Sequence, residues 1–561
     1  MAKIIIDGKE LEVDNKFSVI QAARENGIKI PHFCWHPRLS VAGNCRMCLV
    51  EVEKIPKLVI ACATQVAEGM VVRTKSDRVI NAQQAVMEFL LINHPLDCPI
   101  CDEAGECKLQ DYTYKYSVGV SRFEFEKIRK PKRVALGPHV MLDVERCIMC
   151  SRCIRFCDEV AKKPQLVFSQ RGDHVELTTF PGEELDNAYS MNVIDLCPVG
   201  ALTSRDFRFN ARVWDMSSTE TVCPGCARGC NMTMWVRNNE VLRLTPRLNP
   251  EVNDYWMCDY GRLNTFKHVN AVERLSSSMI RKDGELVEVG WDEAIAAAAF
   301  GLKGVKRNEI AGFGSAFATN EDNYLFAKLM KDAIGTKHLD FLRHVKTGDE
   351  DDLLLRADKT PNSYGAWEVG VRPSQDGYSI EGIVKEIREG KIRALYVLED
   401  DIALDPRIAE VLPKLDFLVV HAHSKNETLK YADVVLSCST YAEKHGTFTN
   451  FQGRVQRIRP AVATVEADRA LDGMAMSRLD KFGAANDRWT HGLRRDARPS
   501  WRILLNVANA LGAKWKYNTI EDVFAELSQK TEAFRGLTYL KIGAKGTMVK
   551  AKVESHQTVS S

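Results

Sequence analysis

The spacing of apolar residues along the chain predicts short strands mixed with amphipathic helices. The opening segment, KIIIDGKELEV, alternates apolar and polar residues in the way of a β-hairpin. The next segment, SVIQAARENGI, has a helical repeat behind the capping residue Ser18, and GNCRMCLVEV then leads into another strand. These elements predict a small α+β domain at the start of the chain.

A longer amphipathic helix is predicted in RVINAQQAVMEFLLIN. Its apolar residues recur at helical spacing at Val79, Ala82, Val86, Phe89 and Leu90. Pro95 favours a helix end near Asn93, which leaves His94 at the exit of the helix.

The second half of the chain has a different pattern. Apolar strand candidates stand in RALYVL, DFLVVHA and ADVVLSC, and helical stretches separate them. Strands alternating with helices indicate a doubly wound α/β sheet, so the whole chain is predicted to be multidomain, of mixed α+β and α/β class.

Composition narrows the functional classes. A chain of 561 residues suggests roughly three or four domains. A formal charge of +2 argues against a nucleic-acid surface. The opening MAKIIIDGKELEV is unlike a targeting peptide, and no apolar stretch approaches membrane-spanning length. We therefore expect any membrane association to come through partner proteins.

The cysteines are distributed unevenly. Of 17 cysteines, all but Cys438 lie between Cys34 and Cys258. In a large chain without an evident secretion signal, this spacing favours metal or cluster ligation over a disulfide framework. Cys438 lies on an apolar strand candidate, where core packing is its expected role.

The first group comprises Cys34, Cys45, Cys48 and Cys62. A plant-type 2Fe-2S loop has a cysteine where this chain has Ser40. We interpret Cys34 as the ligand instead, because a hydroxyl is a poor match for iron beside an available thiol. Zinc is the alternative, but the turn at Gly43 and the apolar strand that follows favour a 2Fe-2S cluster.

The second group, in HPLDCPICDEAGECKLQ, holds Cys98, Cys101 and Cys107 and lacks a fourth cysteine nearby. His94, at the predicted helix end, is close enough in sequence to complete the set. Three cysteines and one histidine suit either structural zinc or a 4Fe-4S cluster, and the local spacing alone does not decide between them.

The third group follows the bacterial ferredoxin run in RCIMCSRCIRFC, with Cys147, Cys150, Cys153 and Cys157. In two-cluster ferredoxins the fourth cysteine of each run serves the other cluster, and a second Cys-Pro occurs here at Cys197. The other three ligand positions of that second run hold Asn187, Ser190 and Val193. We therefore predict one 4Fe-4S cluster on Cys147, Cys150, Cys153 and Cys197, with Cys157 left as a buried apolar residue.

The last group comprises Cys223, Cys226, Cys230 and Cys258, in CPGCARGC and WMCDYGR. A zinc ribbon would have two Cys-x2-Cys knuckles, and this group has only one. A 4Fe-4S cluster is the better interpretation.

Taken in order, these motifs strongly resemble the large iron-sulfur subunit of bacterial NADH:quinone oxidoreductase, respiratory complex I, over about the first five hundred residues. The resemblance implies one 2Fe-2S cluster on the first group and 4Fe-4S clusters on the other three, including His94 with Cys98, Cys101 and Cys107. The part after residue 273 resembles a reduced molybdopterin-oxidoreductase domain. Because LDFLRHVKTGDEDDL holds no cysteine, we expect no molybdopterin.

The resemblance also implies a domain division. It comprises a ferredoxin-like β-grasp domain at 1–78, a domain at 79–118 with one histidine and three cysteines for a 4Fe-4S cluster, a bacterial-ferredoxin-like domain at 119–215, a molybdopterin-oxidoreductase-type 4Fe-4S domain at 216–272, a reduced α/β domain at 273–463, and a C-terminal extension and tail at 464–561. We expect the extension to wrap the surface or contact a partner, and the tail to be loosely ordered.

By this resemblance the chain is an electron-transfer subunit of a translocating oxidoreductase, without a substrate-converting site of its own. It would relay electrons from flavin-bearing NADH-oxidising subunits towards a ferredoxin-like quinone-side subunit, peripherally on the cytoplasmic side of the bacterial inner membrane. The alternatives are a relay subunit of an NAD-linked hydrogenase or formate dehydrogenase, a complete enzyme of either kind, and a zinc-bound scaffold.

Overall fold

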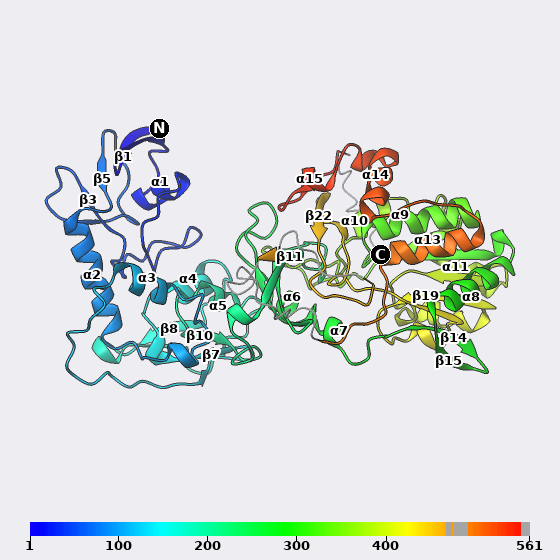
Figure 1. Ribbon diagram of the computed structural model, residues 1–561, viewed down its shortest axis with the longest axis horizontal. Helices are drawn as coiled ribbons and strands as arrows, with labels where there is room; N and C mark the ends of the chain where they lie inside the picture. Colours follow the sequence, from blue (N-terminus) through cyan, green and yellow to red (C-terminus); the bar gives the residue numbers. More distant parts are fainter. Residues whose placement is uncertain (467–473, 476–491, 551–561) are drawn as a thin grey trace. The chain divides into compact units, whose positions relative to one another are not determined.

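A computed structural model describes residues 1–466, 474–475 and 492–550 of the chain. The protein folds into two compact units, Met1–Trp214 and Asp215–Ser561 (Figure 1). Both units combine sheets with helices, which confirms the predicted mixed α+β and α/β class.

The first unit begins with a mixed five-stranded sheet. Its strands, in the order β2-β1-β5-β3-β4, are Lys9–Val13, Ala2–Ile6, Val71–Arg73, Leu49–Val52 and Val59–Ile60. Helix α1, Val19–Glu25, starts behind Ser18 in a capping box and buries its apolar side against the sheet. The predicted hairpin and helix are confirmed.

Two helices follow the sheet. Helix α2 spans Asp77–Leu91, two residues short of the predicted end, and α3 spans Lys108–Tyr116. The buried residues of α2 are Val79, Gln83 and Met87, whereas Phe89 is 75% exposed. The predicted helix is confirmed, but its apolar pattern includes a residue that the fold leaves in solvent.

The rest of the first unit is built from short elements. A three-stranded sheet has the order β10-β7-β6, and β8 pairs with β9. These strands are Leu202–Ser204, Val140–Leu142, Val134–Ala135, Leu166–Ser169 and Glu176–Thr179. Two short helices accompany them, α4 over Arg152–Glu159 and α5 over Asn192–Leu196, and they contact each other.

The second unit opens with a four-stranded antiparallel sheet of order β13-β12-β11-β23. Its strands are Glu240–Pro246, Asn231–Arg237, Ser217–Val222 and Met474–Ala475. Two short helices then follow, α6 over Asp259–Asn264 and α7 over Lys267–Asn270. The candidate ligands Cys223 and Cys230 border the hairpin of β11 and β12.

A seven-stranded sheet forms the centre of the second unit, with the order β15-β14-β20-β19-β18-β16-β17. Strands β16 to β20 run parallel, and β14 and β15 form an antiparallel edge. The strands are Glu285–Val289, Ser278–Lys282, Val434–Ser437, Phe417–Ala422, Ala394–Val397, Ile310–Ser315 and Leu339–Leu342. The predicted strands RALYVL, DFLVVHA and ADVVLSC correspond to β18, β19 and β20.

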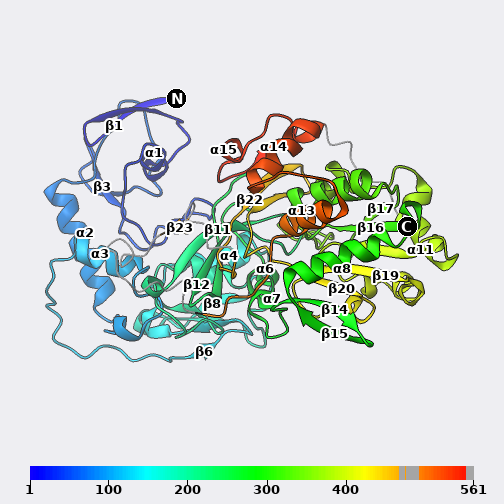
Figure 2. The ribbon, with the colours of Figure 1, turned by 45° about the vertical axis from the view of Figure 1, so that its right-hand side comes forward.

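Helices cover both faces of this sheet (Figure 2). Alternate residues of one strand point to opposite faces, so Tyr396 of β18 joins one apolar core while Leu395 and Val397 join the other. The first core includes α8, α9, α13 and α14, and the second includes α11 and α12. Their bounds are Trp291–Lys303, Asn320–Lys328, Ser500–Leu511, Ile520–Lys530, Ile380–Arg388 and Pro406–Ala409.

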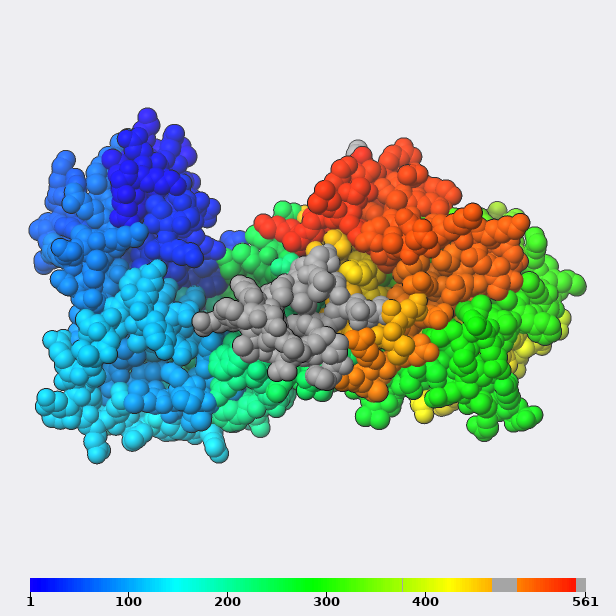
Figure 3. All heavy atoms as spheres, in the orientation of Figure 1, coloured from blue at the N-terminus to red at the C-terminus, as the bar shows by residue number. Residues whose placement is uncertain are grey.

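The remaining elements of the second unit are short. Helix α10 spans Ser363–Glu368, α15 spans Tyr539–Ile542, and a small sheet joins β21, β22 and β24, which are Gly446–Thr449, Arg454–Ile458 and Thr547–Met548. Residues of α13 to α15, orange to red in Figure 3, cover part of this unit. Much of the predicted extension, 467–473 and 476–491, and the end of the predicted tail, 551–561, lie outside the described residues.

Candidate iron-sulfur sites

The first cysteine group is gathered by loops of the five-stranded sheet. Cys45 and Cys48 precede β3, and Cys62 follows β4. The backbone N–H of Cys34 points at the Cys45 sulfur, with 3.5 Å between nitrogen and sulfur. Cys34, Cys48 and Cys62 are buried, and hydrogen bonding from Cys45 and Cys62 lowers the pKa of Cys34. The structure therefore brings all four predicted ligands together.

Ser40, at the position where a plant-type loop has its first cysteine, is engaged elsewhere. Its backbone N–H donates to the Glu159 carboxylate at 2.8 Å, and its hydroxyl donates to the same carboxylate. The contact ties this loop to α4. It gives Ser40 a hydrogen-bonding role and supports the choice of Cys34 as ligand.

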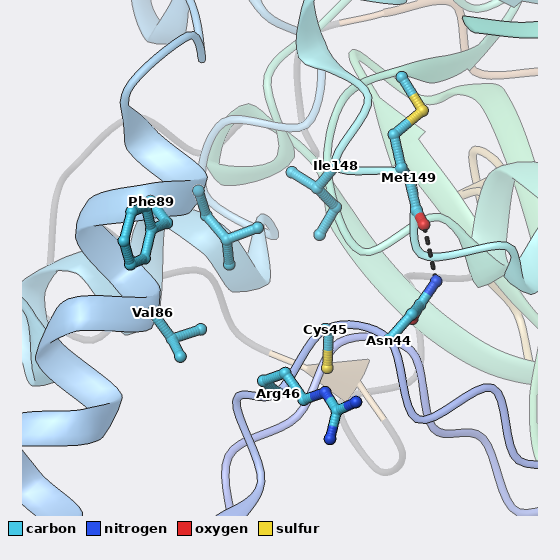
Figure 4. A pocket seen from close by; sticks show the side chains of 8 residues that line it. Asn44, Cys45, Arg46, Val86, Phe89, Ile148 and Met149 are labelled. Atoms are coloured by element: carbon cyan, nitrogen blue, oxygen red, sulfur yellow. Dashed lines mark hydrogen bonds between the residues drawn. The ribbon is translucent and has the colours of Figure 1, made fainter. Parts of the chain in front are cut away.

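The loops of the first and third groups lie next to each other. The Asn44 side-chain amide donates to the Met149 carbonyl at 2.9 Å, as Figure 4 shows. A cavity of about 430 Å³ beside this contact is lined by Cys45 and by apolar residues of α2, among them Val86 and Phe89. Two candidate cluster sites thus share a boundary within the first unit.

The second group surrounds the start of α3. Cys98 begins a 3-10 turn over Cys98–Ile100, and Cys107 is the N-cap residue of α3. Burial raises the pKa of Cys101, and it raises the pKa of Cys107 to about 12. These thiols require a cation or cluster to become thiolates at neutral pH.

His94 lies three residues after the end of α2, with its Nδ1 atom buried and without a hydrogen-bond partner. Burial lowers its pKa to about 4, so the ring is neutral at pH 7, the form that binds metals. Its charged neighbours include Arg146 and Asp97, and Arg146 also acts on Cys101. A neutral imidazole without a hydrogen-bond partner is suited to bind a metal. The assignment of His94 as a cluster ligand stays a prediction.

Gly200 is a residue of this region that sequence reasoning did not single out. A Cβ atom at Gly200 would lie 2.1 Å from the Cys101 sulfur. The glycine follows the Cys197-Pro198 motif, and the Pro198 carbonyl lies 3.9 Å from the Cys107 sulfur. The segment after Cys197 therefore forms a wall of the second site, and only glycine fits at this point.

The third group is assembled from two helices. Cys153 lies in α4, and Cys197 directly follows α5. Cys150 stands between Met149 and Ser151, which both have left-handed backbones, with φ of 52° and 59°. Burial raises the pKa of Cys153 and of Cys197 well above the usual range, and in both cases Cys150 and Cys147 add to the shift. The four predicted ligands are thus close to one another.

The ligand positions that lack cysteine in the second ferredoxin run lie in surroundings of another kind. The Asn187 side-chain amide donates to Gln165 at 2.8 Å, and Gln165 donates to Asp186 at 2.7 Å. Val193 and Cys157 are both buried, and burial, with a contribution from Asp158, raises the pKa of the Cys157 thiol to about 12. A polar network and apolar packing stand where cluster ligands would be.

The fourth group lines a single cavity of about 470 Å³ in the second unit, formed with Gly225, Gly261 and Lys359 among others. All four predicted ligands contribute to its wall, namely Cys223, Cys226, Cys230 and Cys258. A Cβ atom at Gly261 would lie 3.0 Å from the Cys223 sulfur and 3.3 Å from the Cys258 sulfur. A cavity bounded by four buried thiols and lined by glycines fits a cluster of several atoms.

No three His, Cys, Asp or Glu side chains in the described ranges are arranged to hold a single metal ion. Each of the four groups nevertheless has its full number of candidate ligands for a cluster, which contains several metal ions.

Another pocket of the second unit, of about 400 Å³, lies at the carboxyl ends of the parallel strands. It is lined by residues that follow β16, β18 and β19, including Phe317, Asp400 and His423. The ring of His344 lies 3.0 Å from the Asp400 carboxylate, which raises the pKa of His344. Open α/β sheets bind ligands at this end. Sequence reasoning missed the pocket, although polar residues directly after predicted strands were a signal for it.

Five families match successive parts of the chain. They are described as a 2Fe-2S iron-sulfur cluster binding domain (residues 1–77), an NADH-ubiquinone oxidoreductase-G iron-sulfur binding region (83–122), the ferredoxin-like domain of NADH-quinone oxidoreductase subunit 3 (137–203), a molybdopterin oxidoreductase Fe4S4 domain (216–270) and molybdopterin oxidoreductase (362–470). Domains of these descriptions support iron-sulfur clusters of both the 2Fe-2S and the 4Fe-4S type.

The curated relatives of the chain are subunits of NADH-quinone or NADH-ubiquinone oxidoreductase. An NADH-quinone oxidoreductase subunit of Rickettsia bellii is 43% identical over 59% of this chain and 48% of its own length. The corresponding NADH-quinone oxidoreductase subunit of Streptomyces coelicolor is 40% identical over 63% of this chain and 42% of its own length. The 75 kDa subunit of NADH-ubiquinone oxidoreductase from Reclinomonas americana is 42% identical over 59% of this chain and 48% of its own. The chain thus spans about half the length of the relatives it matches.

Among solved structures, a chain of an NAD+-reducing [NiFe]-hydrogenase is 28% identical, over 38% of this chain and 91% of its own, with a TM-score of 0.34. A score this low does not establish a shared fold. The sequence relatives confirm the resemblance to the large iron-sulfur subunit of NADH:quinone oxidoreductase.

Proposed function

We propose that this chain, a relative of the large iron-sulfur subunit of NADH:quinone oxidoreductase, is an electron-transfer subunit of such a complex and carries one 2Fe-2S and three 4Fe-4S clusters. The observation that carries the proposal is the set of four complete ligand groups, one of which lines a cavity of about 470 Å³ with all four of its cysteines. A row of such sites in one chain suits the relay of single electrons.

Iron-sulfur clusters, when bound, exchange one electron at a time at potentials set by cluster type, charge, hydrogen bonds and exposure. The residues of this chain hold the clusters and adjust those properties. The neutral imidazole of His94 replaces an anionic thiolate in the second group and so favours a higher potential there. The Cys223 group is buried throughout, whereas Cys98 of the second group is exposed, so the sites differ in their access to water.

Exposed apolar side chains support docking of partner subunits on the first unit. Phe89 is 75% exposed, Leu96 88%, Ile100 59% and Tyr114 85%, and all four lie on or beside α2 and α3. We assign these side chains to contacts with a protein partner, either a flavin-bearing NADH-oxidising subunit or the ferredoxin-like quinone-side subunit. Exposed large apolar residues can mark such interfaces.

No helix in the described part of the chain is long and apolar enough to cross a bilayer. We place the protein at the cytoplasmic side of the bacterial inner membrane, which it reaches through its partners.

We further propose that the molybdopterin-like part carries no molybdopterin. Residues 339–353, where that family has a metal-ligating thiol or selenocysteine, hold none in this chain. Cys438 does not take over this task, because it is fully buried in the apolar core.

Low-temperature EPR of the dithionite-reduced full chain, purified without oxygen, tests the assignment together with counts of iron, sulfide, zinc and molybdenum. The proposal expects signals of one 2Fe-2S and three 4Fe-4S clusters, iron and acid-labile sulfide in equal amounts, and negligible zinc and molybdenum. Stoichiometric zinc would instead support the scaffold, and stoichiometric molybdenum would support a complete enzyme.

A further inference from the structure

Helix α4 carries two arginines, Arg152 and Arg155, that face the loops of two cysteine groups. Arg152 is 3% exposed. Its guanidinium donates to the Trp35 carbonyl at 2.5 Å and to the Leu196 carbonyl at 3.3 Å. Trp35 follows Cys34 of the first group and Leu196 precedes Cys197 of the third. One buried side chain therefore spans both candidate sites.

Arg155, one helical turn later, makes similar contacts from a more exposed position. It donates to the Cys34 carbonyl at 2.6 Å and to the Cys150 carbonyl at 3.2 Å. The two arginines thus hydrogen-bond to main-chain carbonyls at or next to candidate ligands of both groups. This pattern fixes the distance between the two loops.

Arg152 has no acidic partner in the part of the chain that the structure describes. Among the described residues no carboxylate forms an ion pair with Arg152, and its buried Nε atom has no hydrogen-bond partner. Arg146, also 3% exposed, provides the contrast, because it pairs with Asp97 at 2.9 Å and with Asp143 at 3.2 Å. A buried charge is normally paired, so the isolated guanidinium requires an explanation.

The groups that can explain it are the cysteines. Burial lowers the pKa of Arg152, and the nearby groups that oppose this shift are Cys150, Cys34 and Cys197. These belong to the first and third candidate sites. Clusters held by cysteine thiolates carry net negative charge, which would compensate a buried cation.

We propose that Arg152 is a counter-charge shared by the 2Fe-2S cluster on the Cys34 group and the 4Fe-4S cluster on the Cys147 group, and that it raises the reduction potentials of both. The inference rests on the proposed function, since it requires clusters at both sites. Reduction adds one negative charge to a cluster, and a fixed cation in a poorly solvated interior stabilises the reduced form. Arginine keeps its charge throughout the accessible pH range.

A shared cation has a distinct consequence. Removing it lowers two potentials together, whereas a residue that served only one cluster would shift one. A residue that merely held the loops in place would change cluster content without a common shift. Arg152 therefore acts through its charge and is not a cluster ligand.

The test compares Arg152→Gln, which removes the charge, with Arg152→Lys, which keeps it, in the full chain. Arg24→Gln is the control, because Arg24 acts on the same region from an exposed position where solvent and salt screen its charge. EPR-monitored redox titrations with dithionite follow each cluster. We expect Arg152→Gln to lower the midpoint potentials of the first and third clusters together, Arg152→Lys to stay closer to wild type, and Arg24→Gln to leave both unchanged.

Unchanged potentials in Arg152→Gln, with both clusters present, would overturn the inference, and so would a shift of one cluster alone. If the wild type shows neither signal, the proposed function fails instead. A second measurement covers the case in which Arg152→Gln does not assemble. Pulsed EPR of the chain labelled with nitrogen-15 only in the guanidinium groups of arginine should show nitrogen coupling to both reduced clusters. The coupling should be retained in Arg155→Gln and lost in Arg152→Lys. Its absence from either cluster of the wild type contradicts the shared role.

Discussion

Helices α2 and α9, one in each unit, are stabilised differently. Helix α2 has 15 residues, of which three are buried. Helix α9 has nine residues, of which eight are buried, and it packs in the larger apolar core of the second unit. The longer helix therefore derives far less stability from burial in its own unit.

This difference indicates where each unit obtains its stability. The α2–α3 region has few buried side chains and encloses a candidate cluster site, so ligation must supply part of its folding free energy. The second unit has apolar cores on both faces of a seven-stranded sheet and is expected to fold largely without its cluster. Loss of iron or of single ligands should therefore affect the two units unequally.

Removing iron should have the largest effect. In chain depleted of iron by reduction and chelation, we expect amide hydrogen exchange in α2 and α3 to accelerate by at least about tenfold, while α9 and α13 keep their protection. Hydrogen exchange followed by mass spectrometry measures both regions in one sample. Equal protection of α2 with and without iron would show that the α2–α3 region does not depend on ligation for its stability.

Substitution of single cysteines locates the third cluster. Cys197→Ser should abolish one 4Fe-4S signal, because Cys197 is close to Cys147 and Cys150. Cys157→Ser, a matched change in the same region, should leave every cluster signal in place, because Cys157 is a buried residue outside the predicted set. EPR of both variants decides the matter, and the reverse outcome would show that Cys157 is the ligand.

The second cluster allows a finer test within the α2–α3 region. His94→Cys should retain a 4Fe-4S cluster with a lower potential, because an anionic thiolate replaces a neutral imidazole. His94→Ala should make the same cluster labile, because only the three cysteine ligands remain. Redox titration and the rate of iron loss measure the two effects. A wild-type potential and wild-type lability in both variants would exclude His94 as a ligand.

The last expected effect depends on pH and lies in α9. Burial raises the pKa of Glu321 to about 7, although Thr447 and Tyr539 donate to its carboxylate. A raised pKa means that its contribution to stability is fully present below the unfolded value of 4.5 and is lost as pH rises through 7. The loss amounts to at most ~3 kcal/mol.

Glu321→Gln removes this titration, so the stability of the second unit should depend less on pH between 5 and 7. Thermal unfolding across that range, with iron-depleted chain as a further arm, measures the slope. A slope that matches wild type would show that Glu321 is not the titrating group.

The sequence and the tertiary structure contributed different parts of the candidate sites. The spacing of cysteines in the sequence was enough to identify the cysteine groups. Most ligands of a group lie within a few residues of one another, so that one loop sets their geometry. Cys197 was found from the Cys-Pro ending of a second run, although it lies fifty residues from Cys147. The strands β18, β19 and β20 were equally visible, because fully buried parallel strands are continuous apolar runs.

Other features depended on contacts between distant segments. Phe89 fits the apolar pattern of α2 but is exposed, because neighbouring elements cover only one narrow side of the helix. The sequence likewise does not show that Arg152 lacks an acidic partner among the described residues, that Gly200 closely approaches Cys101, or that α13 is buried in the sheet core.

By itself, then, the sequence determined which residues can ligate and which segments form strands and helices, because both are governed by local spacing. The tertiary structure decided which described charges lie without an acidic partner, which glycines are irreplaceable and which apolar residues remain in solvent. The physical reason is that burial, electrostatic pairing and close approach are properties of neighbours in space, and residues such as Trp35 and Leu196 become neighbours of Arg152 only when the chain folds.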